Sequence, residues 1–211
     1  IGVVYYAKEE YSKSIPYFEK AVALKDELRQ TAKGDIRRDY LASQMITYQG
    51  LAASYTRLAV AYNQQKLTDQ VTQFSNMAIA TIEKAVALSP ANVNIKRVQF
   101  GIYIMLSGID PNYLIDARNT LENVIIQAPT DAKIYYNLGL VYARTNEMDK
   151  ALEILKKTVE LKPNYKEARL AYAYILIDKK LNSEAKIQLE YILANIDPND
   201  SLTKQTLESI K

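Results

Sequence analysis

Histidine, cysteine and tryptophan are absent from the 211-residue chain. Without His or Cys the chain can form no Ser-His-Asp or Cys-His catalytic site, no imidazole or thiolate metal site and no disulfide. The G-x-x-x-x-G-K-[ST], G-x-G-x-x-G and G-x-S-x-G motifs are missing too. Carboxylate pairs such as Glu9-Glu10 point in different directions on a helix and are expected to face solvent. We therefore expect a chain with no catalytic residues, no cofactor and no metal.

Long apolar runs and an excess of one charge are also missing. The longest apolar runs, such as Leu170 to Ile177, have about eight residues, whereas a helix needs roughly 20 to cross a bilayer. The 27 basic and 24 acidic residues give a net charge of +3 and are interspersed along the chain, which is typical of a solvated surface and makes nucleic-acid binding an unfavoured interpretation. Cysteine usage leaves the cellular compartment undetermined, with the cytoplasm as the default.

Glycine and proline are scarce, with six of each, and apolar residues recur at helical spacing. The most regular stretch runs from Ala132 to Tyr165. In its first half, Tyr135, Leu138 and Tyr142 lie on one face of a helix, and Gly139 removes a side chain so that a second helix can approach closely.

The second half of this stretch predicts the partner helix. Ala151 and Leu155 belong to an apolar stripe, and Pro163 ends the helix because it cannot continue it. An aromatic-x2-Leu-Gly-x2-Tyr pattern followed by Ala-x3-large apolar and then Pro resembles the tetratricopeptide repeat (TPR). The resemblance implies an all-α, right-handed α-solenoid of antiparallel helix pairs.

The pattern recurs along the whole chain and predicts a single TPR solenoid domain over 1–211, with about five helix pairs. Ile1-Gly2-x2-Tyr5 fits the middle of a first helix, so we expect a truncated first repeat in a fragment of a longer protein. The segment after Asp200 is expected to be a helix that caps the solenoid or fills its groove. The predicted repeats are 1–28, 36–90, 93–129, 132–165 and 166–198, followed by a capping helix over 200–211.

The second and third repeats depart from the regular pattern. The Tyr-x2-Leu-Ala-x2-Tyr signature occurs twice between Tyr48 and Tyr62, which predicts one helix of about 30 residues over 36–65, or about 45 Å. With a partner helix over 68–88, the second repeat is elongated, and a protruding hairpin is expected near Leu28 to Tyr40. In the third repeat, Asp110 and Pro111 are expected to be the N-cap and first residue of a helix.

In TPR folds, one face of the first helix of each repeat lines a concave groove that binds a protein or peptide. The resemblance implies an apolar, Tyr-rich groove here, with large rigid aromatics as anchors. The alternative is that these residues pack beneath neighbouring repeats or the C-terminal helix. The groove residues expected are Val98, Ile102, Tyr136, Asn137, Leu140, Arg144, Leu170 and Tyr174, with Ile95, Gln99, Met105, Lys133, Glu167, Ile177 and Asp178 beside them.

One TPR binding mode can be compared residue by residue. Heat-shock co-chaperones clamp a C-terminal carboxylate with Lys/Arg and Asn from one repeat, Asn from the next, and Lys and Arg from a third. Asn137 matches the middle group, but Val98 and Ile102 replace the first and Glu167 and Ala171 the last. No such clamp is expected, and Asn137 is interpreted as a packing residue.

Three functions follow as hypotheses. The first is a non-catalytic scaffold for protein–protein interaction. The second comes from the layout of the chain, because RRDYLASQ (37–44), IEKAVALSPANV (82–93) and YYNLGLVYA (135–143) resemble the soluble tail of bacterial O-antigen polymerase/ligase proteins. That resemblance implies an extracytoplasmic appendage whose only membrane attachment is a missing part of the parent chain. The third hypothesis, RNA binding, conflicts with the balanced charge and the apolar groove.

Overall fold

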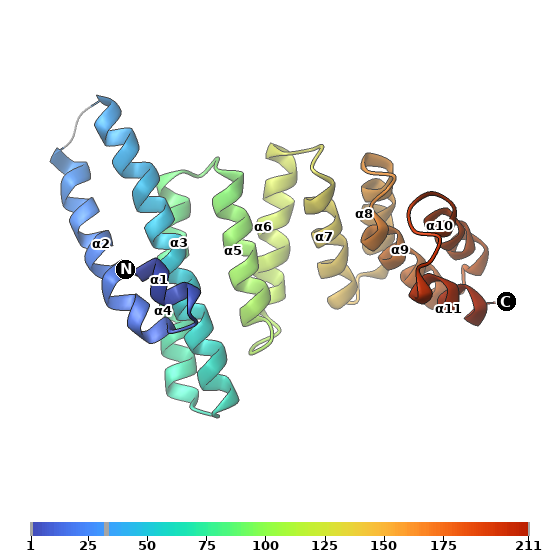
Figure 1. Cartoon of the computed structure of the whole chain (residues 1–211), viewed down its shortest axis with the longest axis horizontal. Helices are drawn as coiled ribbons and strands as arrows, with labels where there is room; N and C mark the ends of the chain where they lie inside the picture. The colour runs from blue at the N-terminus through green and yellow to red at the C-terminus, as the bar shows by residue number, and fades with distance from the viewer. Residues whose placement is uncertain (1, 32–33, 211) are drawn as a thin grey trace. The chain divides into compact units, whose positions relative to one another are not determined.

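The computed structural model describes the backbone of residues 2–31 and 34–210, and within these ranges it contains eleven α-helices and no strand (Figure 1). The predicted all-α composition is therefore confirmed. Contacts divide the chain into two compact units, residues 1–120 and 121–211, which are described separately below. The helices are α1 (Gly2–Ala7), α2 (Tyr11–Thr31), α3 (Gly34–Gln64), α4 (Thr68–Leu88), α5 (Val93–Leu106), α6 (Tyr113–Gln127), α7 (Ala132–Arg144), α8 (Met148–Leu161), α9 (Lys166–Asp178), α10 (Asn182–Asn195) and α11 (Ser201–Ser209).

Four helix pairs are joined by the same turn. In each, a residue with φ near +60° lies two positions after the last residue of the first helix, and the N–H of the following residue donates to a carbonyl five residues back, as in a Schellman motif. A positive φ is strained for residues other than Gly. Here the hydrogen bond to the helix carbonyl, at 2.8–3.1 Å, offsets that strain. The four turn residues are Glu9, Lys66, Asn146 and Lys180, and the accepting carbonyls belong to Tyr5, Tyr62, Tyr142 and Leu176.

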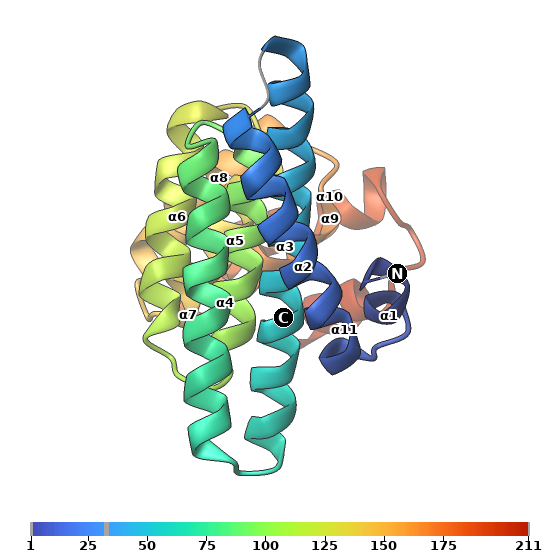
Figure 2. The same cartoon turned by 90° about the vertical axis from the view of Figure 1, so that its left-hand side faces the viewer.

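The long helix predicted in the second repeat is α3, with 31 residues, and its predicted partner is the 21-residue α4. Figures 1 and 2 both show this pair running past α5 at the end where α3 and α4 are joined. Near that end the rings of Tyr62 and Phe74 stack with centroids 5.4 Å apart. Aromatic packing thus supports the elongated part of the repeat.

The helices on either side of the predicted hairpin, α2 and α3, pack against each other, but its turn at residues 32–33 lies outside the described residues. Phe18 of α2 lies against Gly50 of α3, where a Cβ would come within 2.8 Å of the Phe ring. Polar contacts also join the two helices, because Ser14 and Ser54 hydroxyls lie 2.8 Å apart and the Tyr48 hydroxyl donates to Asp26 at 3.1 Å.

The connection between α5 and α6 corrects one expectation. Helix α6 begins at Tyr113, two residues after the predicted first residue Pro111. The Asp110 carboxylate accepts the N–H of Asn112 at 2.9 Å, and its backbone carbonyl accepts the N–H of Tyr113 at 3.2 Å. Asp110 therefore stabilises a turn that precedes the helix instead of capping the helix itself.

The second unit contains the most regular pairs. Gly139 of α7 faces Leu155 of α8, and a Cβ on Gly139 would lie 2.7 Å from Leu155 Cγ, which confirms the predicted close approach. The core between α9 and α10 contains Ala173, Leu176, Ala185 and Leu189. Helix α11 packs on α10 and brings Leu207 and Ile210 against this core.

Candidate functional site

The predicted groove residues of α7 are partly covered. Tyr136 is half-buried, and its ring centroid lies 5.0 Å from that of Tyr165. Burial, and to a smaller extent the charge of Glu167, raises the pKa of Tyr136. Asn137 and Leu140 are half-buried as well, whereas Arg144 is exposed. This surface therefore presents three half-buried side chains and one exposed charge, and part of its apolar area is already in internal contacts.

The predicted groove residues of α9 lie next to α11. Leu170 and Ile177 pack against the core shared by α9 and α10, to which Leu207 and Ile210 of α11 also contribute. Tyr174 is 42% exposed, and its hydroxyl lies 3.5 Å from the Thr206 hydroxyl of α11. Much of the apolar area predicted for a partner here is thus in contact with the protein's own residues.

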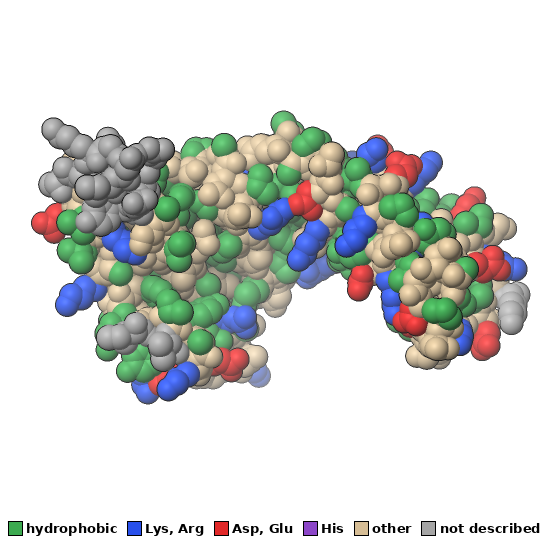
Figure 3. Space-filling view, turned by 45° about the horizontal axis from the view of Figure 1, so that its top comes forward, with side chains coloured by type: hydrophobic (Ala, Val, Ile, Leu, Met, Phe, Trp, Pro, Cys, Tyr) green, Lys and Arg blue, Asp and Glu red, His purple; other side chains and the backbone are tan. Residues whose placement is uncertain are grey.

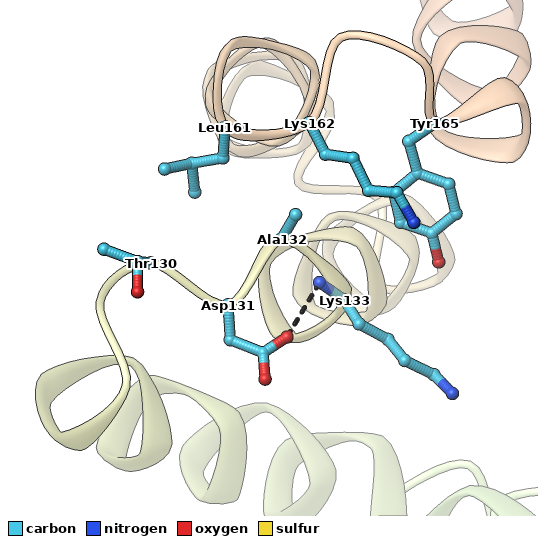
Figure 4. Close-up of a pocket in the computed structure, with 7 residues that line it drawn as sticks. All are labelled: Thr130, Asp131, Ala132, Lys133, Leu161, Lys162 and Tyr165. Carbon is cyan, nitrogen blue, oxygen red and sulfur yellow. Dashed lines mark hydrogen bonds between the residues drawn. The ribbon is translucent and has the colours of Figure 1, made fainter.

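A hollow of about 580 Å³ lies at the start of α7, beside the loop between α8 and α9 (Figure 4). The Asp131 carboxylate caps α7 by accepting the Lys133 N–H at 3.0 Å. The Lys162 ammonium lies 4.7 Å from the centre of the Tyr165 ring. Because the Asp131 carboxylate and the Lys162 ammonium already contact the protein, we assign no ligand to this hollow.

In the first unit, two residues expected in or beside the groove belong to the core. Ile102 is only 3% exposed and Ile95 only 1%, because both pack in the hydrophobic cluster that contains Leu51 of α3 and Ile82 of α4. The assignment of Ile102 to a partner-binding surface was therefore wrong. Val98 of α5 is half-buried and borders an apolar hollow.

That hollow, named here the N-terminal groove, has a volume of about 560 Å³ and is formed by α1, α2, α3 and α5. Two of its apolar side chains are largely exposed, Val3 at 66% and Ile46 at 67%. Figure 3 shows hydrophobic side chains gathered in the left-hand part of the view, where the N-terminal helices lie. The groove is lined by Val3, Tyr6, Phe18, Lys25, Ser43, Ile46, Thr47, Gln49, Gly50, Ala53 and Val98.

The sequence patterns missed this groove except for Val98. The available signal was in α3, where the small residues Ser43, Thr47 and Gly50 lie four and three positions apart, on one face of the helix. The apolar Ile46 lies next to this face. Small side chains along one helix face leave room beside that helix. Their alignment with α1 and α5 depends on packing that no local pattern encodes.

The wall of the N-terminal groove carries one cation. The ammonium of Lys25 donates to the Ser43 carbonyl at 3.1 Å and to the Thr47 hydroxyl at 2.6 Å. Both acceptors are neutral, and burial lowers the pKa of Lys25. No other ionisable group of the described residues forms the wall of this groove, apart from the Tyr6 hydroxyl.

Comparison with known proteins identifies the repeats. The sequence matches tetratricopeptide repeat models over residues 1–27 and 132–165. This chain is a TPR protein. The matched segments coincide with the first and fourth predicted repeats, and the helix pairs α3–α4, α5–α6 and α9–α10 lie at the others.

Solved TPR proteins share the all-α solenoid fold class. The structure of MamA matches with a TM-score of 0.63 and 20% identity, over 99% of this chain and 97% of MamA. YrrB, a TPR protein with an unusual peptide-binding site, matches with a TM-score of 0.60 and 14% identity, over 98% and 88% of the two chains. TTC0263, a thermophilic TPR protein from Thermus thermophilus, gives a TM-score of 0.54 and 23% identity, over 99% and 94%. These identities establish a common fold alone, and no curated protein sequence matches.

Proposed function

We propose that this TPR protein is a non-catalytic interaction module that binds a segment of a partner protein in the N-terminal groove. The observation that carries the proposal is an apolar hollow of about 560 Å³ bordered by the exposed side chains of Val3 and Ile46. Exposed apolar patches with polar borders commonly mark interaction sites. The solved TPR protein YrrB is itself described by its peptide-binding site, which agrees with this interpretation.

The size of the groove suits several side chains of a peptide. Pockets that bind ligands commonly measure about 300–1,000 Å³. Full burial of two or three large apolar side chains contributes roughly 1.5–3 kcal/mol each. Because association costs at least about 4 kcal/mol in lost freedom, this burial alone leaves about 5 kcal/mol at most, so we expect weak binding with dissociation constants of roughly 0.1 mM or higher.

The TPR surface of α7 and α9 is our second candidate for the same function. Its predicted anchors are Tyr136, Leu140, Leu170 and Tyr174, of which only Tyr174 is classed as exposed. If this surface binds the partner segment, a Tyr136→Ala/Tyr174→Ala double variant loses binding. We place it second because α11 and Tyr165 already contact part of it.

A displayed library of random 16-residue peptides, panned on the immobilised chain, tests the proposal. We expect selected peptides whose binding, measured by fluorescence anisotropy, falls at least 10-fold in Ile46→Asp. Ile187→Asp is the matched control, because Ile187 of α10 is similarly exposed, at 61%, but lies outside the groove.

The outcomes separate the two surfaces. Loss of binding in Ile46→Asp with retention in Ile187→Asp supports the N-terminal groove. If only the Tyr136→Ala/Tyr174→Ala variant loses binding, the binding site is the surface of α7 and α9. A library that yields no peptide sensitive to any of these changes contradicts the proposed function.

A further inference from the structure

Lys25 lies where the apolar wall of the N-terminal groove meets helix α2. Its ammonium reaches across to α3, where it donates to the Ser43 carbonyl and the Thr47 hydroxyl. All three residues line the groove. A positive charge is thus fixed at the wall of a mainly apolar hollow, where no other described residue carries a charge at neutral pH.

The hydrogen bonds of this ammonium are incomplete. A lysine ammonium has three N–H donors, and two of them have acceptors among the described residues. Both acceptors are neutral, so the charge itself has no carboxylate partner within that part of the chain. A charge removed from water without a counter-charge is unfavourable, which agrees with the lowered pKa of Lys25 caused by burial.

The nearby carboxylates are engaged elsewhere. Asp26, the next residue, accepts hydrogen bonds from Gln44 and from the Tyr48 hydroxyl. Glu19 accepts one from the Tyr55 hydroxyl. Lys25 therefore has no carboxylate partner among the described residues, and an acidic group of a molecule in the groove can supply its counter-charge.

The extent of the wall indicates the form of the occupant. Along α3 the groove runs from Ser43 to Ala53, which is about 15 Å at 1.5 Å per residue. One side chain cannot cover this length, whereas apolar residues at i, i+4 and i+7 of a helix cover about 10 Å. A cation beside the apolar wall complements an acidic residue beside such a stripe.

We propose that the occupant is an acidic amphipathic helix of a partner protein, whose apolar stripe fills the N-terminal groove and whose Asp or Glu side chain pairs with Lys25. This inference rests on the proposed function and specifies its partner. The carboxylate belongs to a side chain within the helix, because the groove continues along α3 on both sides of Thr47.

Panning the same 16-residue library on the unmodified chain and on Lys25→Met tests the pairing. We expect Asp or Glu beside apolar i, i+4, i+7 positions to be enriched on the unmodified chain and not on Lys25→Met. In the best peptide, synthesised with an amidated C-terminus, Glu→Gln should raise Kd about 10-fold on the unmodified chain and less than 2-fold on Lys25→Met. Lys20→Met is the control, because Lys20 is exposed on the same helix and lies outside the groove.

The outcomes distinguish this inference from the proposed function. Peptides that require Ile46 but bind Lys25→Met as tightly as the unmodified chain overturn the acidic partner and leave the groove assignment intact. If binding disappears when the C-terminus of the peptide is amidated, the group that pairs with Lys25 is the C-terminal carboxylate, and the proposed Asp or Glu side chain is overturned. Peptides insensitive to both Ile46→Asp and Lys25→Met contradict the groove and the inference together.

Discussion

At the scale of single residues, Gly139 and Gly101 occupy the same position of the repeat pattern but have different surroundings. A Cβ on Gly139 would lie 2.7 Å from Cγ of the fully buried Leu155, whereas a Cβ on Gly101 would meet nothing within 4 Å. We expect Gly139→Ala to destabilise its unit by about 1–2 kcal/mol, and Gly101→Ala to stabilise α5 by up to about 1 kcal/mol through helix propensity. Urea unfolding followed by far-UV circular dichroism measures both. Equal effects of the two substitutions would contradict the account of helix contact.

Buried and half-buried tyrosines make the stability depend on pH in the alkaline range. Burial is the main cause that raises the pKa of six Tyr side chains, so the folded chain retains protons that the unfolded chain releases above about pH 10. The stabilisation is complete below pH 10 and is lost as the pH rises through the folded-state pKa values. The six are Tyr55, Tyr103, Tyr113, Tyr136, Tyr165 and Tyr172.

Urea unfolding at pH 8 and at about pH 11 measures this effect, and we expect a lower unfolding midpoint at the higher pH. Tyr103→Phe should reduce the difference, because Tyr103 is only 6% exposed and its hydroxyl has a single long contact, 3.4 Å, with Gln99. Midpoints that agree at the two pH values would show that these hydroxyls titrate normally.

Residue patterns predicted close helix contacts better than exposed surface. The contact of Gly139 with the second helix follows from local spacing and is present in the structure. Ile102 has the spacing of a groove residue, yet its side chain is part of the face of α5 that packs against α3 and α4. Position within a repeat cannot show that a longer neighbouring pair covers the residue, so the burial of Ile102 required the tertiary structure.

At the scale of elements, α11 stabilises the end of the second unit. Leu207 and Ile210 pack against the core of α9 and α10, and Lys166 lies 2.9 Å from Asp197 and 3.0 Å from Asp200 before α11. We expect Leu207→Ser/Ile210→Ser to cost about 2 kcal/mol, since both side chains are half-buried. The unfolding temperature measures the loss.

Leu202→Ser is the control for α11, because Leu202 is 48% exposed on the same helix and should change the unfolding temperature little. If the double variant unfolds at the temperature of the unmodified chain, α11 does not stabilise this unit.

Helix positions were largely predictable, and turn geometry was not. The repeated Tyr-Leu-Ala-Tyr signature correctly indicated one long helix, α3. The start of α6 was misplaced because an Asp before Pro can cap a helix or stabilise a turn with the same side-chain hydrogen bond. Left-handed Lys66 and Lys180 were also unpredicted, since only Gly and Asn adopt that conformation readily.

At the scale of the whole molecule, the TPR architecture is established and its biological setting is a proposal. None of the described helices is long and apolar enough to cross a membrane. Interpretation as an appendage of an O-antigen polymerase/ligase stays a prediction, as does the single solenoid domain over 1–211. Several apolar segments of roughly 20 residues, encoded upstream of Ile1, would support the appendage; a parent chain without them would contradict it.

RNA binding has less support than a protein partner. Lys/Arg and Asp/Glu side chains are interspersed on the face shown in Figure 3. Proteins that bind RNA through phosphates concentrate positive charge and lose affinity steeply with salt. Retention of RNA on the immobilised chain at low salt, released by increasing salt, would favour this alternative over the peptide-binding account.

Hydrogen–deuterium exchange of the whole chain, with and without the selected peptide, tests the central claim most directly. The account predicts slower exchange over residues 43–53 of α3 and around Val98 of α5 when the peptide is bound, with α7 and α9 unchanged. Slower exchange confined to α7 and α9, or no change in either unit at saturating peptide, would contradict a binding site in the N-terminal groove.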